Sequence, residues 1–392
     1  MKILYFSPHP HVNMSAPSGP GTHIREVIRG FEQSGHQVIR LIAGGEALTG
    51  SQAIQIKKRS WKKFIPQYIW QSLKDYSLLR FDRNIESQLG EIIQREKPDA
   101  IYERAYYLMG AGYRAAQQYG VPYYCEINAP YPEEKAEMNG RSIFHRKSEE
   151  NERLQVKAAK RVFVVSSALS KYISSRVEGS EGKLIVTPNA VNPRHIQLDE
   201  HKVKSIRQQL NAGAEDTVIG FVGSIFPYHG VDLLITTFSS LVNNGQDHLR
   251  LLIVGDGEIL NQLKETVKQS GLDHQVLFTG NIPHREVYNY IEAMDIAVMA
   301  RSNWYGSPVK IFEYGIMNKG IIAPDVIPVR DVMTDKIHGL LIPDNEEALK
   351  SALLQMTQDK NATKIMAQNF CNKVKEQHTW QHVSDLILEA MS

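Results

Sequence analysis

Cysteine, long apolar runs and an excess of either charge are all missing from this chain of 392 residues. Its two cysteines, Cys125 and Cys371, lie far apart in the sequence, which rules out a disulfide framework and favours a reducing compartment. The first apolar stretch ends at Ser7, far short of the apolar core of a signal peptide. No stretch approaches 18 uncharged apolar residues, so none predicts a membrane-spanning helix. We therefore expect a cytoplasmic protein.

The charge balance argues against a further class of protein. Lys and Arg total 45 against 43 Asp and Glu, a formal net charge of +2. Proteins that bind nucleic acid usually carry a clear basic excess, so we expect no nucleic-acid partner. Hydrophobic residues make up 42% of the chain and charged residues 22%, as in an ordinary globular protein. A chain of this length is expected to form about two or three domains.

Short apolar stretches alternate with stretches of helical periodicity along the whole chain. A strand over 3–7, a helix over 22–34 and a strand over 37–42 form the βαβ unit that is typical of a parallel sheet. Further strands are predicted at 100–102, 123–127, 162–165 and 184–187, and in the second half at 218–222, 251–254, 276–279, 296–299 and 321–323.

The two series of strands are separated by a polar stretch between about 188 and 216. The sequence therefore predicts an α/β protein with two Rossmann-like, doubly wound lobes that face each other across a cleft. We expect one domain over 1–195, joined by a C-terminal crossover helix within 376–392, and a second over 196–375. Ligands of such sheets bind at the carboxyl ends of the strands, so polar side chains there are the candidate site residues.

The segment 57–70 combines five cations in its first seven residues with four aromatic residues. Cations attract anionic headgroups and aromatic side chains favour the membrane interface. One interpretation is therefore peripheral contact with the inner face of a membrane or with a lipid-phosphate acceptor. The other is a solvated insertion whose aromatic side chains pack inward, since Pro66 interrupts a long amphipathic helix.

The most informative stretch is 302–324, SNWYGSPVKIFEYGIMNKGIIAP. A Gly-Ser-Pro turn precedes a helix predicted to start near Pro308, and the free N–H groups there, with Lys310 in the same turn, make an anion site. Glu313 lies on the same helix face, where a carboxylate can accept hydrogen bonds from two sugar hydroxyls. The pattern predicts a site for a diphosphate and a ribose. The alternative is a surface Lys–Glu pair, which contributes only roughly 0.2–0.5 kcal/mol.

This stretch resembles the sugar-nucleotide-binding helix of the family 4 glycosyltransferases, which have the GT-B fold. The resemblance covers about residues 1–375 and implies that Glu313 binds the nucleotide ribose. The family's usual pattern has a second Glu, which helps to hold the donor sugar, where this chain has Tyr305. The other residues that the resemblance places at the donor in this stretch are Tyr305, Gly306, Ser307, Pro308 and Val309.

Residues 223–230, GSIFPYHG, resemble a family loop in which an Arg and a Lys clamp the donor diphosphate. Here Ser224 and His229 stand at those two positions. The resemblance implies that Gly223 and Ser224 lie at the donor, that Lys310 takes over the diphosphate, and that His229 supplies an N–H group or, when protonated, a positive charge. A purely structural role for His229 is the alternative.

Three further segments resemble elements of the family. The stretch around Ile282 resembles the loop whose backbone holds the nucleotide base, and the stretch around Asn189 resembles an interdomain marker. Gly21 and Thr22 open the first helix like the family's glycine-rich first loop, and their N–H groups are expected to face the donor phosphates across the cleft.

A metal is not expected. The chain contains no Asp-x-Asp, the manganese-binding signature of the other major glycosyltransferase fold. His9 and His11 are close in sequence, but no carboxylate or cysteine accompanies them, and a loop or acceptor-pocket role is favoured. We predict no cofactor besides the nucleotide-sugar donor substrate.

Polar residues at the ends of the first-lobe strands are the acceptor-side candidates. Glu126 and Asn128 lie in the stretch EINAP, and the resemblance implies contact with the transferred sugar or the acceptor. His9 and Arg104 are further candidates for the acceptor pocket. For Arg104 the alternative is a simple ion pair with its neighbour Glu103.

The resemblance implies a retaining glycosyltransferase that moves a sugar from a nucleotide diphosphate sugar to the hydroxyl of a glycan, glycolipid or small-molecule acceptor, in polysaccharide, glycan or glycolipid biosynthesis. Lys310, His229 and Glu126 are the predicted catalytic residues. The departures at Tyr305, Ser224 and His229 favour one alternative, a sugar-nucleotide-binding protein without transferase activity. A GT-B sugar-nucleotide epimerase is the other alternative. The base remains uracil, guanine or adenine.

Overall fold

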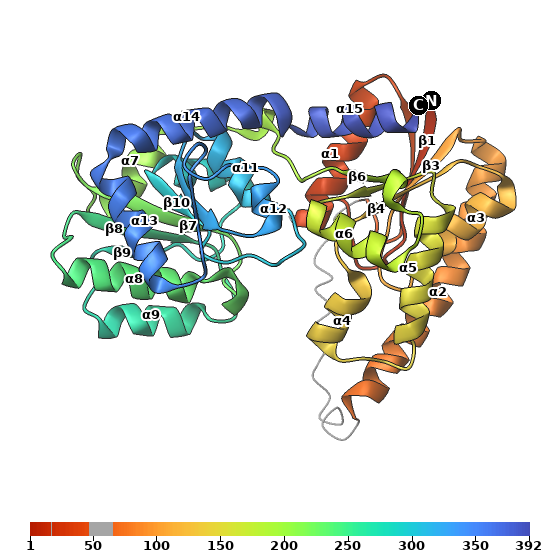
Figure 1. Ribbon diagram of the computed structural model, residues 1–392, viewed down its shortest axis with the longest axis horizontal. Coiled ribbons are helices and arrows are strands. Elements are labelled where there is room, and N and C mark those ends of the chain that lie inside the picture. The colour runs from red at the N-terminus through yellow and green to blue at the C-terminus, as the bar shows by residue number, and fades with distance from the viewer. Residues whose placement is uncertain (17, 47–65) are drawn as a thin grey trace. The chain divides into compact units, whose positions relative to one another are not determined.

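The computed structural model of the chain describes residues 1–16, 18–46 and 66–392. The chain forms two compact units, which we call unit 1 (Met1–Pro188 with Val383–Ser392) and unit 2 (Asn189–His382). Figure 1 shows the elements of each unit. Most of the basic and aromatic segment 57–70 lies outside the described residues.

Unit 1 is built on a parallel six-stranded sheet in the order β2-β1-β3-β4-β5-β6. Its strands are β1 (Lys2–Ser7), β2 (Gln37–Ile42), β3 (Ala100–Arg104), β4 (Tyr123–Ile127), β5 (Arg161–Val164) and β6 (Leu184–Val186). The chain extends outward from β1 in both directions, which is the doubly wound arrangement. β3 and β4 are buried along their whole length, as expected for central strands covered on both faces.

Helices connect these strands. Those of unit 1 are α1 (Gly19–Gln33), α2 (Gln67–Glu96), α3 (Ala111–Tyr119), α4 (Tyr131–Asn139), α5 (His145–Ala158) and α6 (Ser167–Arg176). The terminal helix α15 (Trp380–Met391) carries the chain from unit 2 back into unit 1. There Tyr124 Oη donates to the carbonyl of Met391 at 2.9 Å, and Ser34 Oγ donates to Asp385 at 2.8 Å. These bonds anchor the end of the chain in unit 1.

Unit 2 holds a second parallel six-stranded sheet, in the order β12-β11-β10-β7-β8-β9. Its strands are β7 (Thr217–Val222), β8 (Leu249–Val254), β9 (Val276–Phe278), β10 (Ile296–Val298), β11 (Gly320–Pro324) and β12 (Leu340–Ile342). Its helices are α7 (Glu200–Gln209), α8 (Val231–Asn243), α9 (Leu260–Gln269), α10 (Val287–Glu292), α11 (Val309–Ile316), α12 (Ile327–Arg330), α13 (Glu346–Gln358) and α14 (Lys360–Gln377). Two apolar clusters fill its interior.

The predicted fold class is confirmed: both halves are doubly wound parallel α/β sheets. The strand β12 was not predicted. The chain passes between the units at 188–189 and 382–383, whereas the predicted domain boundaries are 195 and 375. No helix within the described residues is long and apolar enough to cross a membrane.

Candidate functional site

The turn before α11 is held in shape by two asparagines. Asn189 donates from its backbone N–H to Ser307 Oγ at 3.0 Å and from its side chain to the Ser307 carbonyl at 2.7 Å. Asn303 Oδ1 accepts hydrogen bonds from the N–H groups of Tyr305 and Gly306. The predicted donor residues 305–309 therefore form a preorganised turn. Asn303 was not predicted, and only its place before the glycine could have suggested it.

The start of α11 is left open by this arrangement. Pro308 is the residue before the first helical residue, rather than part of the first turn as predicted, and no side chain caps the helix. The first N–H groups of an α-helix have no intrahelical partner, and together they attract an anion. The N–H groups of Val309 and Lys310 therefore remain available to a ligand, while those of Tyr305 and Gly306 are already bound by Asn303.

Lys310 carries a buried ammonium group beside this helix start. Its Nζ lies 4.3 Å from the centre of the Phe221 ring and has no hydrogen-bond partner among the described residues. Burial lowers the pKa of Lys310 to about 8, although Glu313 acts in the opposite direction. The alternative of a surface Lys–Glu pair is therefore wrong, because Glu313 is also buried.

Gly223 makes room for that ammonium group. A Cβ atom at this position would lie 3.0 Å from Lys310 Nζ, and the residue has φ +142°, which side chains rarely adopt. The end of β7 thus approaches Lys310 through a glycine backbone. The neighbouring Ser224 has an exposed side chain, and its carbonyl faces His229.

His229 differs from its predicted role. Its Nδ1 is hydrogen-bonded to the carbonyl of Ser224, and because a carbonyl only accepts, Nδ1 must carry the proton. Burial and the charge of Lys310 lower the pKa of His229 to about 4, outweighing the effect of the Ser224 bond. At neutral pH the ring therefore carries no positive charge, its one N–H is already used, and Nε2 can only accept a hydrogen bond.

Glu313 lies one turn into α11 and is only 9% exposed. His284, in the loop after β9, brings Nε2 to 3.8 Å from Glu313 Oε1. Burial raises the pKa of Glu313, whereas the charges of His284 and Lys310 act to lower it. This loop also contains Ile282, which packs partly buried against the core of unit 2. The predicted base and ribose positions thus adjoin each other, and His284, which sequence reasoning missed, connects them.

A further residue that sequence reasoning missed fixes α11 to the sheet. The hydroxyl of Tyr314 is buried and accepts a hydrogen bond from the N–H of Val222, the last residue of β7, at 2.8 Å. This bond sets the helix against the strand end that leads to Gly223. The distance between Lys310 and the glycine backbone is therefore determined by Tyr314 as well as by packing.

In unit 1, the predicted phosphate contacts at the start of α1 are already engaged. The N–H of Gly21 donates to Ser18 Oγ at 3.3 Å, and that of Thr22 donates to the Ser18 carbonyl at 2.9 Å. Thr22 Oγ1 accepts a hydrogen bond from Arg25. A phosphate could reach these N–H groups only by displacing Ser18, so the structure gives less support to this part of the prediction than to α11.

Glu126 is the centre of a buried network rather than an open carboxylate at the end of its strand. It is 2% exposed and accepts a hydrogen bond from Tyr102 Oη at 2.6 Å, while His23 Nε2 lies at 2.9 Å. Arg104 and Asn128 also donate to it. Burial raises the pKa of Glu126, but His23 and Arg104 lower this pKa by more than burial raises it. The side chain therefore remains ionised. The predicted direct contact with a substrate is therefore unsupported.

Glu103 and Arg104 do not pair with each other. Neighbouring strand residues point to opposite faces of a sheet. Arg104 binds Glu126, whereas Glu103 accepts a hydrogen bond from Tyr123 Oη at 2.7 Å on the other face. Burial raises the pKa of Glu103 to about 8. The alternative of a local Glu103–Arg104 ion pair is wrong.

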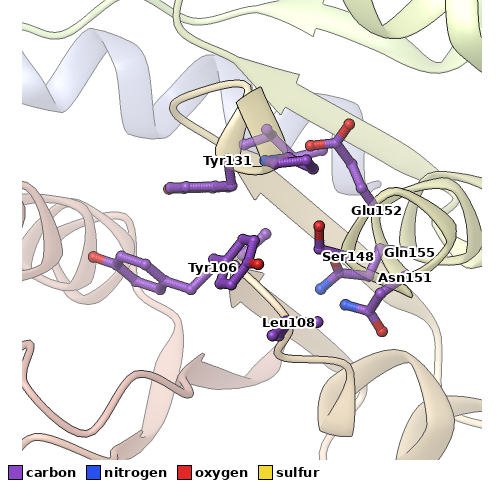
Figure 2. Close-up of a pocket in the computed structure, with 11 residues that line it drawn as sticks. Tyr106, Leu108, Tyr131, Ser148, Asn151, Glu152 and Gln155 are labelled. Carbon is purple, nitrogen blue, oxygen red and sulfur yellow. The ribbon is translucent and has the colours of Figure 1, made fainter. Parts of the chain in front are cut away.

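His9 lies beside a small pocket at the same sheet edge. Its ring is 5.1 Å from that of Tyr106, which contacts Arg104 Nε at 3.2 Å and lies 5.5 Å from the ring of Tyr131. Figure 2 shows Tyr106 and Tyr131 across this pocket from Glu152. The cavity itself is only about 10 Å³, which is room for about one water molecule.

Glu152 is the unusual member of the pocket wall. Its Oε2 is buried and has no hydrogen-bond partner among the described residues. Burial raises the pKa of Glu152 to about 8, so the carboxyl is mostly protonated at neutral pH. The protonated carboxyl of Glu152 is therefore a hydrogen-bond donor in a pocket that Tyr106 and Tyr131 also line. Within the described ranges, no group of three or more His, Cys, Asp or Glu side chains is arranged to hold a metal ion.

Comparison with known proteins identifies the family. The signature described as glycosyltransferase family 4 matches residues 17–195, and that described as glycosyl transferases group 1 matches residues 202–373. The two matches are consecutive and together span both sheets. The chain belongs to the family 4 glycosyltransferases.

Curated relatives of this family 4 chain are distant and align over part of their length. A glycosyltransferase of Methanocaldococcus jannaschii is 26% identical over 51% of this chain and 53% of that protein. The 2-deoxystreptamine glucosyltransferase of Streptomyces kanamyceticus is 26% identical over 38% of each. The chain thus spans about half, or less, of the length of these relatives.

Solved structures share the GT-B fold over the whole family 4 chain. Anabaena HepE in complex with UDP has a TM-score of 0.71 at 16% identity, covering 100% of this chain and 99% of that one. The sucrose-phosphate synthase of Thermosynechococcus elongatus has a TM-score of 0.73 at 17% identity, covering 100% and 98%. At these identities the likeness establishes the fold alone.

Proposed function

We propose that the chain transfers a sugar from a nucleotide diphosphate sugar to an acceptor hydroxyl, with retention at the anomeric carbon. The observation that carries the proposal is the ammonium group of Lys310, which is buried beside the uncapped start of α11 and has no hydrogen-bond partner among the described residues. A buried charge without a partner is costly, and a diphosphate would satisfy both the charge and the free N–H groups.

The donor would lie along unit 2 in a definite order. Lys310 and the first N–H groups of α11 bind the diphosphate, and Glu313 accepts hydrogen bonds from the ribose hydroxyls. The base lies against the backbone near Ile282. His229, being neutral, accepts a hydrogen bond at Nε2 instead of supplying charge. The donor residues thus come from the carboxyl ends of the strands of one sheet, as is usual in this fold.

The chemistry then needs no nucleophilic carboxylate. The bond between the anomeric carbon and the diphosphate oxygen breaks, and the acceptor oxygen bonds to the same face of the sugar. The acceptor proton passes to an oxygen of the departing diphosphate. Lys310 and the helix N–H groups stabilise the negative charge that grows on this leaving group. No step requires a metal, and Glu126 acts as a positioning residue for Arg104, His23 and Asn128.

UDP is the first nucleotide to test. The Anabaena neighbour was solved with UDP and with UDP-glucose, and we propose the same base for this chain. We propose a glycan, glycolipid or small-molecule acceptor and a cytoplasmic site of action.

The test begins with a thermal-shift screen of UDP, GDP and ADP and their sugar conjugates, without and then with divalent metal. A nucleotide at about 100 times its Kd should stabilise unit 2 by roughly 2.7 kcal/mol. Lys310→Ala should lower turnover on the order of 100-fold, and Glu313→Ala should mainly weaken donor binding. Unchanged binding and rates in both variants would remove the site assignment.

A second candidate function is sugar-nucleotide binding without transfer. It is favoured by His229, which lacks the positive charge expected of a diphosphate clamp, and by Tyr305 in place of the family's Glu. Binding of UDP-sugar without transfer or hydrolysis across many acceptors would support it. Release of an epimerised sugar without an acceptor would instead indicate an epimerase.

A further inference from the structure

Exposed apolar side chains are concentrated at one end of unit 1. Of fourteen large hydrophobic residues that are exposed in the described parts of the chain, six lie on the first turns of α2, on the end of α4 or in the connection to α5. They are Tyr68, Ile69, Leu73, Tyr76, Met138 and Ile143, and we call them the α2–α4 face. Figure 1 shows the start of α2 and α4 at the same end of unit 1.

The face is a fixed surface, because hydrogen bonds tie its two segments together. Gln67 Nε2 donates to the carbonyl of Asn139 at 3.0 Å, and the N–H of Ile143 donates to Ser72 Oγ at 3.1 Å. Ser142 Oγ donates to the buried Asp75 at 2.5 Å. Met138 and Ile143 nevertheless remain 72% and 70% exposed.

On α2 the apolar side chains form a stripe. Ile69, Leu73 and Tyr76 are spaced by four and three residues, which places them on one face of the helix. The opposite side of the same turns is buried in unit 1 and includes Gln71 and Asp75. The stripe is therefore the outward side of an amphipathic helix, and nothing in unit 1 covers it within the described residues.

Most of the exposed charges around the stripe are positive. Between 67 and 83, both acids of α2, Asp75 and Asp82, are buried and engaged with unit 1, whereas the cations of this part are exposed. The exposed cations are Lys74, Arg80 and Arg83 on α2 and Arg141, Arg146 and Lys147 after α4. Glu137, on α4, is an exposed acid that acts against this pattern.

We propose that the α2–α4 face docks the chain on an anionic phospholipid surface. Apolar side chains surrounded by Lys and Arg match a bilayer boundary, where the acyl region takes the stripe and the headgroups take the cations. Tyrosines at the edge of the stripe suit this boundary, because one end of the ring is apolar and the other polar. Every residue that we assign to this site lies within the described residues. The proposal goes beyond sugar transfer, since docking needs no donor.

Co-sedimentation of the full chain with vesicles tests the proposal. The vesicles contain either phosphatidylcholine alone or phosphatidylcholine with about 40% phosphatidylglycerol, at low and high salt. We expect binding to the anionic vesicles that weakens as salt rises, and far weaker binding to the neutral ones. Replacing Lys74 and Arg80 with Gln should weaken binding roughly fivefold for each cation.

The apolar contribution is tested with matched pairs. The double variant Leu73→Ser, Ile143→Ser should bind anionic vesicles more weakly by roughly tenfold or more. The control pair, Ile365→Ser and Leu198→Ser, removes similarly exposed side chains from unit 2 and should leave vesicle binding unchanged. All four positions are exposed, so folding should be retained, and melting curves with and without UDP check this separately from docking.

Three results would overturn the proposal. One is the absence of vesicle binding at low salt by a folded chain. Another is equal loss in the Leu73, Ile143 pair and in its control. The third is self-association, measured by light scattering, that the double variant Leu73→Ser, Ile143→Ser abolishes while its vesicle binding stays unchanged. That result would make the face a contact between copies of the chain. Failure of UDP binding alone would affect only the proposed function.

Discussion

Raising the pH above 8 should release the proposed diphosphate ligand by neutralising Lys310. In the ligand-free chain the pKa of Lys310 is about 8, because burial disfavours the ammonium form. A bound diphosphate would return this pKa towards the ordinary value of about 10.4. Binding is then coupled to protonation, and the affinity follows the fraction of ligand-free chain in which Lys310 is charged.

The magnitude follows from these two pKa values. At pH 7 about nine-tenths of the Lys310 side chains are charged, and at pH 9 about one-tenth, so the affinity should fall about tenfold per pH unit above roughly pH 8.5. The full difference, about 2.4 pKa units, corresponds to about 3 kcal/mol. His229 contributes nothing in this range, because its pKa of about 4 leaves it neutral throughout.

Isothermal titration with UDP between pH 7 and pH 9.5 measures the effect, and uridine, which lacks phosphate, is the ligand control. Lys310→Met should bind UDP weakly at every pH, and Lys310→Arg, whose charge persists, should show no loss over this range. Circular dichroism at each pH verifies the fold. A Kd for UDP that stays constant from pH 7 to 9.5 in the unaltered chain would refute the reasoning, as would the same loss in Lys310→Arg.

Three further predictions concern stability and packing. Gly223→Ala should lower the thermal midpoint and weaken UDP binding, since its Cβ would lie 3.0 Å from the Lys310 ammonium in a backbone conformation that costs roughly 1–3 kcal/mol; unchanged melting and titration would contradict this. Lys310→Met should raise the thermal midpoint at pH 7, and this gain should shrink as the pH rises from about 8 to 10.5. In that pH range the unfolded chain binds more protons at Lys310 than the folded chain does, so the unaltered chain gains stability as the pH rises. Glu126→Gln should destabilise unit 1 by roughly 3–5 kcal/mol at pH 7, since it leaves the charge of Arg104 buried without its carboxylate partner. The pKa of Glu126 is lowered by folding, so this difference in urea unfolding should diminish as the pH falls below the ordinary carboxyl range, and a difference that grows instead would exclude the charge explanation.

The fold was largely predictable because its strands are short apolar runs between polar turns. The expected strands at 37–42 and 123–127 coincide with β2 and β4, and the crossover helix expected within 376–392 is α15. The exception is β12, whose membership in the sheet depends on pairing with β11. Such pairing is a tertiary contact that local periodicity does not show.

The candidate site was predictable where its members lie one helical turn apart. Lys310 and Glu313 could be placed together by the period of α11 alone. The contacts between Asn189 and Ser307 and between Val222 and Tyr314 join residues about a hundred positions apart, and no local sequence pattern predicts them. They are the bonds that hold the turn and the helix in position.

The separation of Glu103 from Arg104, by contrast, was available from the sequence. Alternation along a strand places adjacent side chains on opposite faces, so a local ion pair within β3 was never a good expectation. What alternation could not show is which partners lie on each face. Those partners, Glu126 for one and Tyr123 for the other, come from the neighbouring strand β4.

The two buried charges that the sequence singled out differ in one decisive respect. Glu126 is surrounded by donors, including His23, Arg104 and Tyr102, so its charge is already stabilised within unit 1 and removing it should cost stability. Lys310 has an aromatic ring and a glycine backbone as neighbours but no hydrogen-bond partner among the described residues, so its charge is a cost to the empty chain. The proposed diphosphate would offset this cost by pairing with the charge. For this reason Lys310→Met, which should weaken donor binding, is also expected to stabilise unit 2, whereas Glu126→Gln should weaken the fold.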